Sequence, residues 1–133
     1  MKKKKIFAKI CGGCLLLSAI GIVNVYAVDY TGYALPARQG NNYTTQHEKE
    51  TADNYIYNKV VDLENTSTVT FWAANSNKKQ ISDDYDQKLG NNSKIKFTAS
   101  GYDAVGEEVM LGMENAKWYW FERAFVAGEV DFR

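Results

Sequence analysis

Cysteine, proline and histidine are scarce in this chain, and the shortages exclude several kinds of chemistry. The 133 residues include two Cys, one Pro and one His. Both cysteines, Cys11 and Cys14, lie within the first 27 residues, so a chain cleaved after residue 27 has no disulfide and no thiolate metal site. The single histidine, His47, cannot form the paired-histidine zinc motif, because Thr51 stands where the second histidine belongs.

A concentrated positive charge is also missing. The whole chain has 16 basic and 16 acidic residues, but five of the basic ones and none of the acidic ones lie in residues 1–27. The remaining 106 residues therefore carry a net charge of −5. Nucleic acids and anionic lipid surfaces both require clustered Lys and Arg. We expect no nucleic-acid partner, no electrostatic membrane docking and no cofactor.

The N-terminal residues have the pattern of a bacterial signal peptide. Lys2–Lys5 form a basic region, residues 15–23 form an apolar run, and Ala27 ends a stretch suited to signal peptidase. The apolar run is too short for a comfortable membrane span. We therefore predict a signal-peptide helix over residues 1–27, cleavage after Ala27, a secreted protein and no stable membrane span in the processed chain.

Alternating apolar and polar residues predict an all-β protein. The clearest strands cover residues 55–63, 68–74 and 94–100, and no segment shows sustained helical periodicity. We expect residues 28–54 to be an irregular segment and residues 55–133 to be an antiparallel β domain. The expected architecture is a small antiparallel β-sandwich or barrel of about five to seven strands.

The C-terminal residues 107–133 hold two of the three Trp and two apolar runs, separated by residues 114–117. This pattern predicts a β-hairpin that supplies much of the core. In its second half, Trp118, Tyr119, Trp120 and Phe121 would make both faces of the returning strand large and apolar. Two interpretations remain open: the rings fill the core, or they form an exposed platform for sugar rings or a partner protein.

Two acidic residues, Asp84 and Asp86, are the remaining candidates for a site. Their spacing begins a calcium-loop pattern, but Lys88 falls where a ligand is needed and no Glu closes the loop. Paired carboxylates could also serve a glycoside hydrolase if the fold set their separation. Clustered acids on a loop are more often a solvated surface. We expect no catalytic residues and no enzymatic activity.

Residues 60–133 resemble a family of small exported Gram-positive proteins that carries a domain-of-unknown-function label. The resemblance rests on Phe71-Trp72, Gly90, the run Val109–Asn115 and Gly128. In size, export and expected β-sandwich the chain is also distantly similar to lactococcin-type bacteriocins. The resemblance implies no enzymatic activity and no catalytic residues.

These observations favour an exported, non-enzymatic binding protein of a Gram-positive bacterium, bacteriocin-like or associated with the cell envelope. Its expected partner is a cell-envelope glycan or another protein, contacted through residues 118–121. Two alternatives stay open. One is a small cell-wall glycan hydrolase that uses Asp84 and Asp86, and the other is a structural surface subunit with residues 107–133 as its interface.

Overall fold

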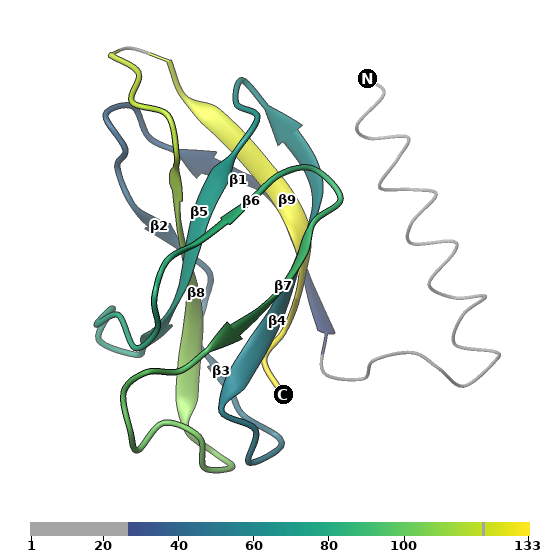
Figure 1. Ribbon diagram of the computed structural model, residues 1–133, viewed down its shortest axis with the longest axis vertical. Coiled ribbons are helices and arrows are strands. Elements are labelled where there is room, and N and C mark those ends of the chain that lie inside the picture. The colour runs from purple at the N-terminus through teal and green to yellow at the C-terminus, as the bar shows by residue number, and fades with distance from the viewer. Residues whose placement is uncertain (1–26, 121) are drawn as a thin grey trace, which may run out of the picture.

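Two antiparallel sheets face each other in the computed structural model, which describes residues 27–120 and 122–133 (Figure 1). Sheet A has the strand order β1-β9-β4-β7, and sheet B has the order β2-β8-β5-β6 with β3 also paired to β8. The strands are β1 (Ala27–Leu35), β2 (Asn42–Tyr43), β3 (His47–Glu48), β4 (Tyr55–Glu64), β5 (Val69–Asn75), β6 (Tyr85–Gln87), β7 (Asn92–Lys96), β8 (Glu108–Asn115) and β9 (Ala124–Asp131).

This arrangement confirms the predicted all-β antiparallel sandwich. The described residues contain no helix, and so none that could cross a membrane. The described part of the chain has nine strands in place of the expected five to seven, because β2, β3 and β6 are pieces of two or three residues. Such short segments carry too little alternation to be recognised in a sequence.

The core lies between the sheets and is built by inward-facing residues of the long strands. In β4, Ile56 and Val60 are fully buried, whereas Tyr55 and Lys59 point outward. Strand β5 is buried along almost its whole length because β6 and β8 flank it and side chains cover its outer face. The principal core residues are Tyr30, Leu35, Ile56, Val60, Val69, Phe71, Ala73, Ile81, Ile95, Val109, Leu111, Met113, Ala124, Val126, Val130 and Phe132.

The sequence predicts an irregular segment over residues 28–54. These residues instead contain most of β1 and all of β2 and β3. Strand β1 pairs with β9 over nearly its whole length. A bulge between Tyr30 and Tyr33, with Gly32 at a positive φ of 61°, shifts the register in its middle. That shift breaks the period-two pattern by which the sequence would have revealed a strand. Strand β1 begins at Ala27, while the rest of the predicted signal peptide lies outside the described residues.

The predicted C-terminal hairpin is wrong. Strands β8 and β9 do not pair with each other: β8 lies between β2 and β5 in sheet B, and β9 lies between β1 and β4 in sheet A. Residues 116–123 cross from one sheet to the other. Because both strands are central in their own sheets, the crossing lets each bury its apolar inner face in the shared core, which is the arrangement of a sandwich. The expected returning strand over residues 118–121 is part of this connection.

Candidate functional site: an aromatic tip on three loops

Three connections between the sheets meet at one end of the sandwich. They are residues 36–41, 65–68 and 116–123, and hydrogen bonds join them. The N–H of Arg38 donates to the carbonyl of Tyr119 at 2.7 Å, and the N–H of Ala116 donates to Thr68 at 3.2 Å. The Asn65 side-chain amide donates to the carbonyl of Arg123 at 3.1 Å. The long connection is therefore held on both sides.

The start of this long connection is also fixed by side chains. The Asn115 Oδ1 atom accepts hydrogen bonds from the Thr66 hydroxyl at 2.7 Å and from the Lys117 N–H at 2.9 Å. The Gln39 amide donates to the carbonyl of Ala116 at 3.2 Å. These bonds replace the ladder hydrogen bonds that a strand would have made. The start of the loop is thereby tied to the two neighbouring loops, through Thr66 and Gln39.

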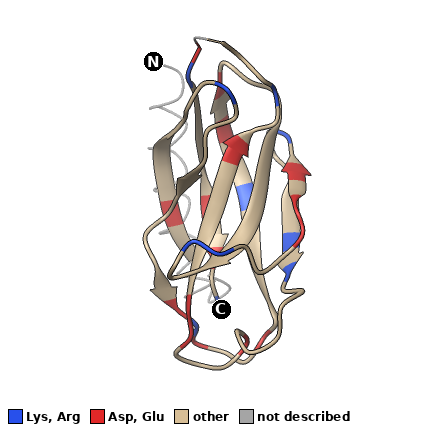
Figure 2. Cartoon of the chain, turned by 90° about the vertical axis from the view of Figure 1, so that its left-hand side faces the viewer, with Lys and Arg blue, Asp and Glu red and all other residues tan. Residues whose placement is uncertain are grey.

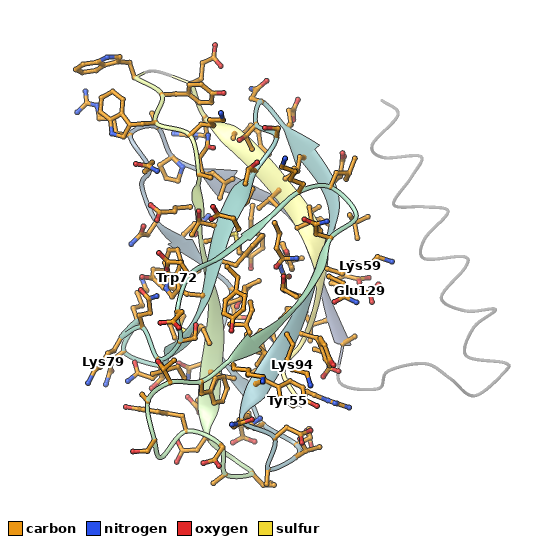
Figure 3. All side chains as sticks on the ribbon, viewed as in Figure 1. Tyr55, Lys59, Trp72, Lys79, Lys94 and Glu129 are labelled. Carbon is orange, nitrogen blue, oxygen red and sulfur yellow. The ribbon has the colours of Figure 1, made fainter. Side chains whose placement is uncertain are left out.

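Trp118 and Trp120 project from this loop into solvent. Their exposed fractions are 48% and 60%, whereas Trp72, the third tryptophan, is 4% exposed. The two exposed rings meet edge to face, with centroids 4.8 Å apart and planes at 81°. Figure 3 shows side chains of this end of the molecule extending away from the sheets. Trp118 and Trp120 therefore lie at the surface and not in the core, whereas Tyr119 between them is half-buried.

Arg38 completes the cluster from the neighbouring loop. Its guanidinium carbon lies 5.3 Å from the ring centroid of Trp120, within cation–π range. We call Arg38, Trp118, Tyr119 and Trp120 the aromatic tip. Phe121, the fourth predicted binding residue, lies outside the described residues. Sequence reasoning missed Arg38, because nothing local shows that residues 36–41 lie beside residues 116–123. The only signal was the turn framed by Pro36 and Gly40.

Asp86 lies in β6 of sheet B, and Asp84 comes just before that strand. Both are exposed, and each is already engaged: Asp84 accepts from the Gln80 amide at 2.8 Å, and Asp86 accepts from the Thr70 hydroxyl at 2.6 Å. Burial, together with both aspartates, raises the pKa of Glu114. The described residues hold no group of three or more His, Cys, Asp or Glu that could bind a metal ion. Figure 2 shows acidic positions spread over this side of the molecule.

The outer side of sheet A has a shallow hollow and a pair of aromatic rings. A hollow of about 270 Å³ is lined by Tyr57, Lys59 and Glu129, with Ala27, Asn92 and Asp131 around it. Figure 3 shows Lys59 and Glu129 side by side here, with Tyr55 and Lys94 nearer the opposite end from the tip. The Lys94 Nζ atom lies 4.4 Å from the Tyr55 ring centroid. These rings are covered by their own neighbours and are less exposed than the tip.

No protein-family model and no curated protein matches this sequence. Solved structures share parts of the architecture at low identity. The crystal structure of PirA is 8% identical with a TM-score of 0.43, covering 86% of this chain and 99% of that one. The CBM36-1 domain of a multidomain xylanase from the hindgut metagenome of Trinervitermes trinervoides is 8% identical with a TM-score of 0.44, covering 78% and 94%. A non-crystalline cellulose specific carbohydrate-binding module, CBM28, is 13% identical with a TM-score of 0.44, covering 80% and 72%.

Proposed function

We propose that this protein is an exported, non-enzymatic binding module that contacts a cell-envelope glycan through the aromatic tip. The observation that carries the proposal is the exposure of Trp118 and Trp120 on a loop that hydrogen bonds hold in place. Burying one indole side chain contributes about 2–3 kcal/mol to stability. Trp118 and Trp120 lie in solvent and do not make this contribution to stability. Exposed apolar side chains that cluster in this way are typical of binding surfaces.

A saccharide suits these rings for a physical reason. The C–H faces of a pyranose are apolar, and they stack on flat aromatic surfaces, while the hydroxyl groups remain hydrated. Tryptophan is also enriched at the centres of binding surfaces, where it provides large contact area with few rotatable bonds. Hydrogen bonds at Ala116, Lys117 and Tyr119 hold the backbone around the rings, so little flexibility is lost when the rings are covered.

Export is the second part of the proposal. It is supported by the basic and apolar pattern of residues 1–27 and by the resemblance to small exported Gram-positive proteins. A bacteriocin-like role belongs to the same proposal, because a secreted binding module that acts on neighbouring cells would need the same two parts.

Expression in a Gram-positive host tests export directly. The protein in the medium should begin at Val28, as read by N-terminal sequencing, and retention of residues 1–27 would contradict export.

Binding is tested with purified cell-wall glycan in a pull-down assay. The Trp118→Ala/Trp120→Ala double variant should lose at least about tenfold in affinity, as expected when two central aromatic contacts are removed. Val105→Ala is the matched control, since Val105 is an exposed apolar residue (64%) between β7 and β8, away from the tip loops. Equal binding by the double variant and the control would reject the tip as the glycan site.

The same exposed rings also support a second candidate, a structural subunit that associates through the tip. In that case size-exclusion chromatography coupled to light scattering should give a dimer or larger assembly. The Trp118→Ala/Trp120→Ala variant should then elute as a monomer. A monomeric wild type at all accessible concentrations would leave the glycan-binding function as the better account.

A further inference from the structure

The guanidinium of Arg38 is a positive group beside the Trp120 ring of the tip, and it forms no ion pair with any acid among the described residues. Within residues 27–120 and 122–133 it forms neither an ion pair nor a side-chain hydrogen bond, and its ring contact with Trp120 is its one side-chain interaction. The exposed Lys117 and Arg123 lie on the adjacent loop together with one acid, Glu122, and a second exposed acid, Glu64, ends β4 beside this loop. The tip therefore carries local positive charge on a domain whose net charge is −5.

The backbone at Arg38 has an unfavourable conformation. Arg38 and Gln39 have positive φ values of 60° and 55°, in the left-handed region that glycine favours. A side chain at Gly40 would press on Pro36, so the turn is also tight at its end. Strained residues of this kind persist where surrounding structure fixes them, and they cluster at ligand sites. Here the fixing contacts are the Arg38 N–H bond to Tyr119 and the Gln39 amide bond to Ala116.

The angle between the rings limits the form of the ligand. At 81° the two indoles form a corner and not a single plane. A crystalline polysaccharide surface needs coplanar rings, whereas a corner receives one chain, with a sugar face on one ring and a sugar edge on the other. Arg38 stands at the Trp120 side of this corner. A guanidinium there matches a carboxylate or phosphate on the sugar, which it can bind through two parallel hydrogen bonds.

We propose that the aromatic tip selects a single saccharide chain bearing an anionic group, with the sugar stacked on Trp118 and Trp120 and its carboxylate or phosphate bound by Arg38. This inference rests on the proposed glycan-binding function and specifies its ligand. The alternative of an anionic lipid surface is less well matched, because the acidic domain behind the tip would be repelled by such a surface.

Isothermal titration calorimetry of the purified protein tests the proposal with matched ligands. The probes are a cello-oligosaccharide, the same oligosaccharide oxidised at C6 to glucuronate, and the same oligosaccharide phosphorylated at C6. At low salt at least one anionic probe should bind about tenfold more tightly than the neutral one, as expected for a charge-assisted pair. Which anionic probe binds distinguishes a carboxylate from a phosphate ligand. The preference should shrink at 0.5 M salt.

Arg38→Gln should reduce the affinity for the anionic probe to that for the neutral one, and Arg38→Lys should keep part of the difference. Lys79→Gln is the matched control, because Lys79 is exposed in the connection between β5 and β6. Equal affinities for neutral and anionic probes, or an Arg38→Gln variant with unchanged preference, would overturn this inference and leave glycan binding intact. No binding of any probe, with no effect of Trp118→Ala on wall binding, would reject both. Binding to phosphatidylglycerol vesicles alone would also overturn it.

A measurement without ligand checks the electrostatic part. Iodide should quench the fluorescence of Trp118 and Trp120 more strongly than caesium does, when each is scaled to its quenching of free N-acetyltryptophanamide, because Arg38 attracts anions to the rings. Arg38→Gln should clearly reduce the excess of iodide over caesium quenching at low salt, because the positive group nearest Trp120 is then missing. Circular dichroism of the variant provides the folding control, and an unchanged iodide preference would contradict the assignment.

Discussion

The indole of Trp72 lies directly over Gly112 on the outer face of sheet B, where a Cβ atom at residue 112 would overlap the ring. The two residues are cross-strand partners in β5 and β8. Tyr43 closes the other side of the indole edge to face, with centroids 5.9 Å apart and planes at 85°. Figure 3 shows Trp72 on this side of the molecule. A glycine is thus required here by close approach and not by backbone conformation.

Gly112→Ala is therefore expected to lower the free energy of unfolding by about 2 kcal/mol, since the ring must leave its position to admit a methyl group. Urea denaturation followed by far-UV circular dichroism measures the loss. Trp72→Ala should cost about 3 kcal/mol by itself. The double variant should cost clearly less than the sum, because the clash disappears with the ring. Additive losses would show that the overlap is not the cause.

The buried chain of Tyr30, Asn58 and Gln87 predicts instability at alkaline pH. The Tyr30 hydroxyl donates to Asn58 Oδ1 at 2.7 Å, and the Asn58 amide donates to Gln87 at 2.9 Å. Burial raises the pKa of Tyr30 far above its usual value, more than the bond to Asn58 lowers it. A raised folded-state pKa gives stability that is complete below the unfolded value, about 10, and is lost as the pH rises beyond it.

We therefore expect the free energy of unfolding to fall steeply above about pH 10, and the Tyr30→Phe variant to fall less steeply. At pH 7 the same variant should be less stable by about 1–2 kcal/mol, because Asn58 Oδ1 loses its donor. Tyr119→Phe serves as the control, because Tyr119 lies in the tip loop outside the core. Parallel curves for wild type and Tyr30→Phe would refute this account.

Lys49 is a cation enclosed in the protein, with 1% of its surface exposed. Its Nζ atom donates to the carbonyl of Arg133 at 3.0 Å and lies 5.4 Å from the Phe97 ring centroid. Burial lowers the pKa of Lys49, and Asp53, Asp103 and Asp131 offset part of the effect. The Lys49 amine therefore binds a proton more strongly in the unfolded chain than in the folded one. As a result, the free energy of unfolding increases with pH up to about pH 10.

Lys49→Met retains the apolar stem and removes the buried charge. The variant is expected to equal or exceed the wild type in stability by up to about 2 kcal/mol at pH 7, as found when buried ions are replaced by apolar groups. Its stability should also depend less on pH between 7 and 10. Thermal unfolding across that range measures both effects. Lys49→Ala, which leaves a cavity, should lose about 2 kcal/mol. A destabilised Lys49→Met variant would show that the charge itself is needed.

Fluorescence quenching should distinguish the two exposed tryptophans from the buried one. Acrylamide should reach Trp118 and Trp120 and leave Trp72 largely shielded, in keeping with their exposed fractions. The Trp118→Phe/Trp120→Phe variant should therefore show blue-shifted, weakly quenched emission. It should also lie within about 0.5 kcal/mol of the wild-type stability, as is usual for surface substitutions. Strong quenching of the remaining Trp72 would contradict the described packing.

Local pattern was enough to identify strands but not their partners. The alternation in residues 55–63, 68–74 and 107–113 matches β4, β5 and β8 closely. The turn-like residues 114–117 suggested that β8 returns to pair with β9, yet pairing depends on which strands lie beside each other in the finished core. Trp118 and Trp120, two apart, imitate strand alternation. Hydrogen bonds to Arg38 and Asn65 set the conformation of their loop. These two residues are far from the loop in the sequence, so no local pattern could predict the bonds.

The pairing of β1 with β9 also bears on how the protein folds. Sheet A joins the first described strand to the last, so β1 has no neighbour within its sheet until β9 has formed. Loops of nearly a hundred residues must close before that contact stabilises anything, which slows folding of β proteins. A chain leaving the ribosome would thus remain without its complete sandwich until β9 emerges. Such a delay would suit the proposed export, because a chain without its complete sandwich can still pass through a secretion channel.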